Sequence, residues 1–120
     1  MRGASALGDL LAAHPSADVR VLVVWLPVIA SDLGPPTATV RHPLTVDPRV
    51  TEFWDPTQWA SHRILSRPGS ESAHREGVVW DEVDAYPKGV LWADPFPTPS
   101  WSGRPIVDQL QVVDGLLRGP

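Results

Sequence analysis

The sequence predicts one α/β domain over residues 1–120, in which helices cover a mixed sheet with a parallel centre and an antiparallel hairpin at one edge. Two observations lead to this fold class. The run 19–30 (VRVLVVWLPVIA) is the one long apolar stretch, and β-branched residues dominate it, as is typical of a strand buried on both faces. Segments with helical and strand-like patterns surround this run over 120 residues, the length of a single domain.

The segment before the apolar run is expected to form a helix over residues 5–14. Its leucines recur at spacings of three and four, which places them on one helix face (Leu7, Leu10 and Leu11). Pro15 is expected to end this helix, because the residue before a proline avoids the helical region.

Regular pairing of the apolar run is expected to stop near Trp25 or Leu26, because Pro27 has no N–H group to donate. Residues 31–48 then form a predicted loop, since its glycine and prolines forbid a continuous helix. A short helical turn over 37–40 is compatible with this loop.

A short strand is predicted over residues 49–54, with Val50 and Phe53 facing inward. A helix running to Leu65 is expected to follow it, because the start signals of a helix come next in the chain. These signals are Asp55 as N-cap, Pro56 at the first position, Gln58 as capping-box partner, and Trp54 with Trp59 as a hydrophobic staple.

The last third of the chain is expected to contain a hairpin and a helix. Residues 78–86 and 90–92 have strand patterns on either side of the turn 87–89, and residues 93–105 form a proline-rich loop. The final helix is expected to begin at an Asp108 cap and to end at Gly119. Its capping-box partner is Gln111, its staple is Val107 with Val112, and its buried face is Val107, Leu110, Val113 and Leu117.

Composition excludes several classes of function. The net charge is −4 and the chain has no cluster of basic residues, so neither nucleic acid nor a membrane surface is an expected partner. The apolar run is shorter than the roughly 20 residues that span a bilayer, and no signal peptide opens the chain, so a cytoplasmic location is expected. The chain has no cysteine, so it cannot carry thiol chemistry by itself.

No arrangement of polar residues predicts catalysis, a metal or a cofactor. The spacing of His42, His62 and His74 matches no ligand motif. Ser61 and His62 are adjacent on a predicted helix and point apart, so with Asp55 they do not make a triad.

Two further groups have a structural and a functional interpretation. The carboxylates of residues 81–84 are interpreted as a partly solvated edge strand, with Asp81 on the face opposite to Glu82 and Asp84; a carboxylate site is the alternative. Residues 95–101 are interpreted as a stiff loop whose Phe96 and Trp101 fold back onto the sheet, and a polyproline ligand is the alternative.

Several segments, in their order and spacing, resemble a bacterial thioredoxin-like family. They are Val24-Trp25-Leu26-Pro27-Val28 ending in Ser31-Asp32, then Asp47-Pro48-Arg49-Val50-Thr51 with Phe53-Trp54-Asp55, then Trp80-Asp81, and finally Gly103-Arg104-Pro105-Ile106-Val107. The resemblance implies a thioredoxin-like fold. It also implies that a first strand and a Cys-x-x-Cys pair would precede the helix at 5–14 and are absent here. An alternative alignment gives residues 19–25 the role of that first strand, with 26–29 in place of the redox loop.

Two functions are compatible with this resemblance. The first is a redox-inactive thioredoxin-like domain that acts as a binding or structural module. The second is a shortened form of a thiol-disulfide oxidoreductase whose cysteine pair lies upstream of residue 1. The expected partner is a protein or a second copy that pairs with a sheet edge left open by the absent strand. The residues expected to bind are Trp25, Pro27, Asp32, Trp92, Trp101 and Arg104.

Overall fold

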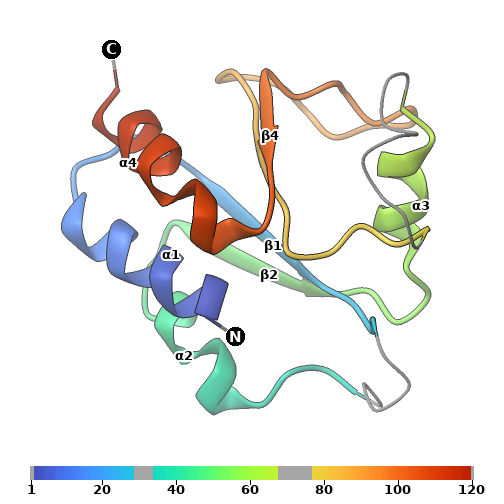
Figure 1. The fold of residues 1–120 in the computed structure, drawn as a ribbon, viewed down its shortest axis with the longest axis horizontal. Coiled ribbons are helices and arrows are strands. Elements are labelled where there is room, and N and C mark those ends of the chain that lie inside the picture. The colour runs from blue at the N-terminus through green and yellow to red at the C-terminus, as the bar shows by residue number, and fades with distance from the viewer. Residues whose placement is uncertain (1, 29–33, 68–76, 120) are drawn as a thin grey trace.

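A computed structural model describes residues 2–28, 34–67 and 77–119 and contains two separate two-stranded sheets with helices around them (Figure 1). Strand β1 (Val21–Trp25) pairs in parallel with β2 (Val50–Trp54), and β3 (Val83–Ala85) pairs antiparallel with β4 (Trp101–Gly103). The chain is therefore mixed α/β, as predicted. The prediction of one continuous sheet is wrong, because the parallel pair and the antiparallel pair share no strand in the described part of the chain.

The helices gather at two places around these sheets. In Figure 1, α1 (Arg2–Ala13), α2 (Ala38–Thr45) and α4 (Leu110–Arg118) lie at one end of the parallel pair. Helix α3 (Trp59–Leu65) lies on the other side of the molecule, beyond the antiparallel pair. The predicted helix at 5–14 is confirmed as α1, which begins earlier and ends one residue sooner.

Arg49 joins the end of α1 to the start of the parallel pair. Its guanidinium donates hydrogen bonds to the carbonyl oxygens of Leu11, in the last turn of α1, and of His14, directly after the helix, both at 2.8 Å. The Asp47 carboxylate accepts from the same guanidinium at 2.6 Å. Hydrogen bonds from the Arg49 side chain and backbone lower the pKa of Asp47 to about 2. The backbone carbonyl of Arg49 accepts from the Val21 N–H at 3.0 Å.

Strand β1 ends at Trp25, as Pro27 predicted, but it is not buried on both faces. Leu22 is 45% exposed, because one face of the pair is uncovered in the described part of the chain. The register places Leu22 beside Thr51 and Val24 beside Phe53 on that face. Phe53 is 50% exposed, so the prediction that it faces inward is wrong. It alternates with Val50, which lies on the opposite, covered face.

Residues 38–45 form a helix where a loop was predicted, and Pro43 lies inside it. A proline within a helix removes one backbone hydrogen bond, so contacts outside the helix must stabilise it. Helix α1 supplies such a contact at Gly8, which is buried. A Cβ atom on Gly8 would lie 2.4 Å from the Pro43 carbonyl oxygen. The two helices therefore cross with backbone against backbone at this point.

Helix α3 begins at Trp59, four residues after the predicted cap, so the predicted capping box is wrong. Gln58 has a left-handed backbone (φ 58°), and its side-chain amide donates to the Pro27 carbonyl at 2.6 Å. The Asp55 carboxylate still serves the helix start, because it accepts from the Ala60 N–H at 2.8 Å. The ring of Trp59 packs against Phe96, where a staple with Trp54 was predicted.

The predicted hairpin of residues 78–86 and 90–92 is wrong. Asp81 has a left-handed backbone (φ 51°), which interrupts the first strand, and residues 90–92 are exposed and form no strand. The partner of β3 is instead β4, which lies in the segment predicted to be a loop. The last helix also differs: a 3-10 turn at Ile106–Gln109 precedes α4, and Asp108 is not its cap. Gly119 ends α4 with φ 74°, as predicted.

The crossing of α1 and α2 can be tested with one methyl group. Gly8→Ala is expected to lower the free energy of unfolding by about 1–3 kcal/mol, because the new Cβ overlaps a backbone oxygen. Gly115→Ala is the matched control: it lies in α4, nothing lies within 4 Å of its added Cβ, and it should gain up to about 1 kcal/mol of helix propensity. Urea unfolding followed by circular dichroism measures both changes. A Gly8→Ala protein as stable as the original would contradict this account of the crossing.

Candidate binding site

The residues predicted to bind lie in separate places and do not form one site. Trp25 and Pro27 lie at and just after the end of β1. The indole N–H of Trp25 donates to Glu52 at 2.8 Å, and the Pro27 carbonyl accepts from Gln58. Asp32 lies outside the described residues. The polar groups of Trp25 and Pro27 are therefore occupied by contacts within the chain.

Trp101 and Arg104 lie on β4 and directly after it. The half-buried Trp101 ring covers Gly103, where an added Cβ would lie 2.5 Å from a ring carbon. Arg104 is exposed, and its backbone carbonyl accepts from the Gln109 side chain at 3.3 Å. The absence of a side chain at Gly103 therefore allows the Trp101 ring to pack closely against its own strand.

Trp92, the remaining predicted residue, belongs to a cluster of aromatic rings. Its ring stacks on Phe96 with the centroids 4.8 Å apart, and Tyr86 meets it edge-on at 6.2 Å. Trp59 contacts the same Phe96 edge-on at 5.3 Å. Phe96 is buried, as the fold-back interpretation predicted, whereas Trp59 and Trp92 are 50% and 36% exposed. We call Trp59, Tyr86, Trp92 and Phe96 the aromatic surface.

Three separate segments bring these rings together. Trp59 opens α3, Tyr86 directly follows β3, and Trp92 and Phe96 lie in the proline-rich connection to β4. The guanidinium of Arg63, one turn along α3 from Trp59, lies 5.3 Å from the Trp59 ring centroid, a cation–π distance. The sequence gives Trp59 a different role, as a staple residue, and no local pattern pairs α3 with the connection to β4.

A buried ion pair lies beneath the aromatic surface. The Arg67 guanidinium donates to Asp84 at 3.1 Å and to the Tyr86 hydroxyl at 2.8 Å. The side chains of Arg67 and Asp84 are 7% and 10% exposed. Ser102 also donates to Asp84, at 2.7 Å. The interpretation of Asp84 as part of a solvated edge strand is therefore wrong: Asp84 is an internal acceptor that links α3 to both strands of the small sheet.

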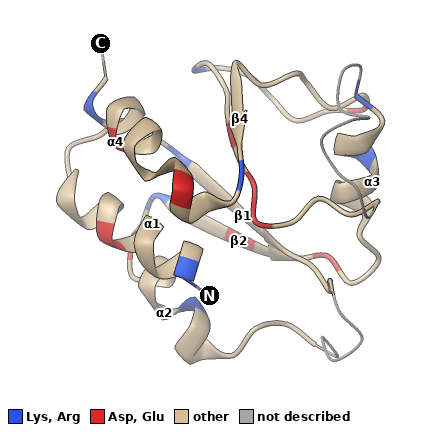
Figure 2. Cartoon of the chain, viewed as in Figure 1, with Lys and Arg blue, Asp and Glu red and all other residues tan. Residues whose placement is uncertain are grey.

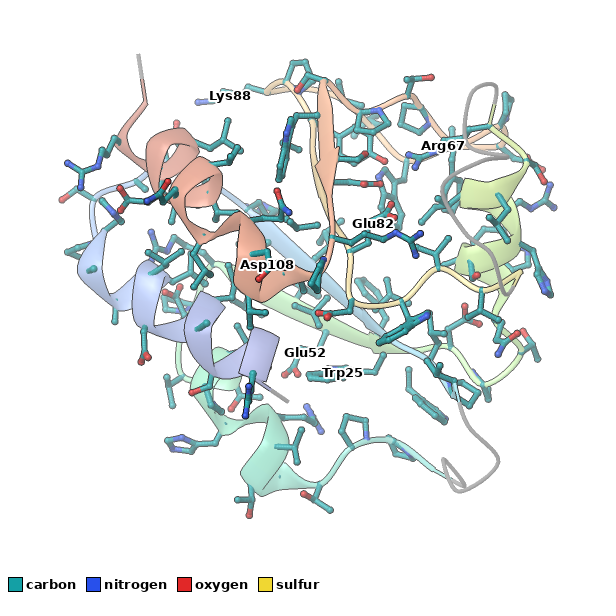
Figure 3. All side chains as sticks on the ribbon, in the orientation of Figure 1. Trp25, Glu52, Arg67, Glu82, Lys88 and Asp108 are labelled. Carbon is teal, nitrogen blue, oxygen red and sulfur yellow. The ribbon has the colours of Figure 1, made fainter. Side chains whose placement is uncertain are left out.

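Glu82 shares this polar cluster, between β4 and the Arg67 region in Figure 3. Burial is the largest cause that raises its pKa, to about 7, and the hydrogen bond and charge of Asp84 act in the same direction. The positive charges of Arg67 and Arg104 oppose this rise. Asp81, the third predicted carboxylate, accepts instead from the Ile106 N–H at 3.3 Å. The carboxyl groups of Glu82 and Asp84 thus lie in hydrogen-bond contact next to Arg67.

A surface pocket of about 390 Å³ borders the aromatic surface. Its charged residues are Arg63, Arg67 and Asp94, and Arg63 pairs with Asp94 at 3.0 Å. Its remaining lining residues are Ser66 and the segment 95–98. A larger pocket of about 610 Å³ lies between the end of α1 and the end of α4. The smaller pocket is the one that includes a residue of the aromatic surface, the buried Phe96.

The structure places the other candidate residues in ordinary roles. The hydroxyl of Ser61 is buried and accepts from the Val79 N–H at 2.7 Å. No group of three or more His, Asp and Glu side chains suited to a metal ion occurs in the described ranges, and His74 lies outside them. Among the helices that the structure describes, none has the length and apolar character needed to cross a membrane.

Comparison of the chain with protein-family models, with curated proteins and with solved structures finds no match to any of them.

The raised pKa of Glu82 predicts a pH-dependent stability. The folded chain keeps a proton on Glu82 that the unfolded chain releases above about pH 4.5, so stability is complete below this pH and falls until about pH 7. Glu82→Gln should remove this part of the decline in urea unfolding measured from pH 4.5 to 7. The titration of Asp47, whose pKa is lowered to about 2, changes the stability only below this pH range. Equal pH slopes for both proteins would contradict the placement of Glu82.

Proposed function

We propose that this chain is a redox-inactive, thioredoxin-like module that binds a proline-rich segment of a partner protein on the aromatic surface. The observation that carries the proposal is a pair of tryptophan rings, Trp59 and Trp92, exposed on either side of the buried Phe96. The thioredoxin-like relationship is supported by the sequence resemblance and by a mixed α/β architecture with a parallel and an antiparallel strand pair.

The absence of cysteine limits this module to chemistry other than thiol exchange. Exchange needs a thiolate as the attacking group, and no other side chain here supplies one. A thioredoxin-like chain that lacks the thiolate can act only through its binding surfaces. The most distinctive of these surfaces is the aromatic surface, which combines exposed rings with a hydrogen bond from the buried Arg67, itself paired with Asp84, to the hydroxyl of its member Tyr86.

A proline-rich partner fits the chemistry of the aromatic surface. Extended proline-rich segments lose little conformational entropy on binding and dock between exposed aromatic rings. Within the chain, Phe96, which stands between Pro95 and Pro97 in the sequence, packs its ring against both Trp59 and Trp92. The rings therefore accommodate a proline-flanked segment in the folded chain. Arg63 and Asp94 add a polar rim.

Binding can be tested with a synthetic oligoproline peptide and the indole N–H signals in a proton–nitrogen NMR spectrum. The signals of Trp59 and Trp92 are expected to move in a saturable manner, since these rings form the contact. Trp59→Ala and Trp92→Ala should each weaken binding by roughly tenfold, or about 1.4 kcal/mol.

Trp80 is the matched control for this experiment. It is 46% exposed, similar to Trp59, and it makes no ring contact with the aromatic surface in the described structure. Trp80→Ala should leave the binding unchanged, and a glycine-serine peptide should move no signal. If oligoproline shifts neither Trp59 nor Trp92 at millimolar concentration, the proposed function is wrong.

A second candidate function is favoured by the uncovered side of β1. The chain is then the shortened form of a thiol-disulfide oxidoreductase, and an apolar strand with a Cys-x-x-Cys pair precedes residue 1. Such a strand would find backbone partners along β1, which has a single neighbour in the described structure. The codons before Met1 test this candidate. An in-frame Cys-x-x-Cys after an apolar strand is the expected result, and a stop codon directly upstream would contradict it.

A further inference from the structure

One edge of β1 carries unpaired backbone groups. The Val21 N–H donates to Arg49, and the Trp25 carbonyl accepts from the Asp55 N–H at 2.8 Å, so these two residues direct their backbone groups toward β2. Because backbone groups alternate along a strand, Leu22 and Val24 direct theirs to the opposite side. The sheet has two strands, and neither residue is hydrogen-bonded there to another described segment.

This edge also lacks the features that usually prevent strands from pairing. Charged side chains, prolines and bulges protect free edges in most proteins. The run 21–26 is uncharged, and Pro27 follows only after it; β1 carries no charged residue in Figure 2. The outer edge of β2 differs, since Glu52 lies on that strand and pairs with Arg41 at 3.3 Å.

Apolar side chains are accessible on the uncovered face of the parallel pair. Leu22 is 45% exposed on β1, and Phe53 is 50% exposed on β2. They share one face of the parallel pair. A strand that adds to β1 would thus meet open backbone groups and an apolar face together, which is the usual chemistry of strand addition.

We infer that two copies of this chain pair through β1, antiparallel and about a twofold axis at Val23. The symmetry places Leu22 of each copy opposite Val24 of the other. Both residues have their N–H and carbonyl groups on this edge, so each exchanges a pair of hydrogen bonds across the axis. The same register places Arg20 opposite Leu26, so no like charges face each other.

A second copy is the occupant that this edge favours. A twofold interface requires a surface that is complementary to itself. An uncharged strand edge that pairs antiparallel with its own copy meets that requirement. Short uncharged segments rich in β-branched residues associate with identical segments. The resulting strand order is β2–β1–β1–β2, which leaves the aromatic surface outside the interface strands. The inference therefore does not depend on the proposed function.

Analytical ultracentrifugation across a wide concentration range tests the inference on the whole chain. The mass is expected to rise from 13.1 kDa toward twice that value. Leu22→Lys, which places a charge on the free edge, should raise the dimer dissociation constant at least about tenfold. Thr51→Lys is the matched control, because Thr51 lies beside Leu22 on the same face but one strand away from the edge. It should dimerise like the original chain.

Hydrogen exchange adds a test that needs no variant. The amides of Leu22 and Val24 should become protected as the concentration rises, whereas Val23, which faces β2, should be protected at every concentration. A chain that stays monomeric at millimolar concentration would overturn the inference. Equal dissociation by both lysine variants, or protection of Leu22 and Val24 that persists at high dilution, would also overturn it.

Discussion

The contact on which the rest of the structure depends is the set of hydrogen bonds made by Arg49. One guanidinium satisfies carbonyls at the end of α1 and binds the Asp47 carboxylate, while the backbone of the same residue starts the parallel pair at Val21. A two-stranded sheet is marginal without such support. Because α1 is held here at its C-terminal end and crosses α2 at Gly8, the covered face of β1 and β2 acquires its helices from this junction.

The small antiparallel sheet depends on a different kind of interaction. Its strands are only three residues each, and the buried pair of Arg67 and Asp84 joins them to α3. A buried ion pair adds little net stability compared with apolar packing, but loss of one partner leaves an uncompensated charge. The pair joins Arg67, two residues after α3, to β3, and Trp59 at the start of the same helix contacts Phe96. The aromatic surface is thus built over a polar base that permits few alternative arrangements.

The two surfaces available for binding have separate physical origins. The aromatic surface forms where the Phe96 ring packs between Trp59 and Trp92, so that Phe96 is buried and the two tryptophans remain partly exposed. The free edge exists because the parallel and antiparallel pairs do not join into one sheet. The charged residues are arranged accordingly: Arg63 and Arg67 line the pocket beside the rings, and no charge lies within β1.

By itself the sequence determined the position and end of β1, the helix before it and the lack of thiol chemistry, because periodicity, a proline and the absence of a sulfur atom are local facts. It also placed Trp92 at the surface and Phe96 in the interior. Only the tertiary structure decided that β4 replaces residues 90–92 as the partner of β3, that 38–45 is helical despite Pro43, and that Asp84 meets Arg67. The physical reason is that each of these outcomes depends on contacts between distant segments, whose energies exceed local propensity and leave no local pattern.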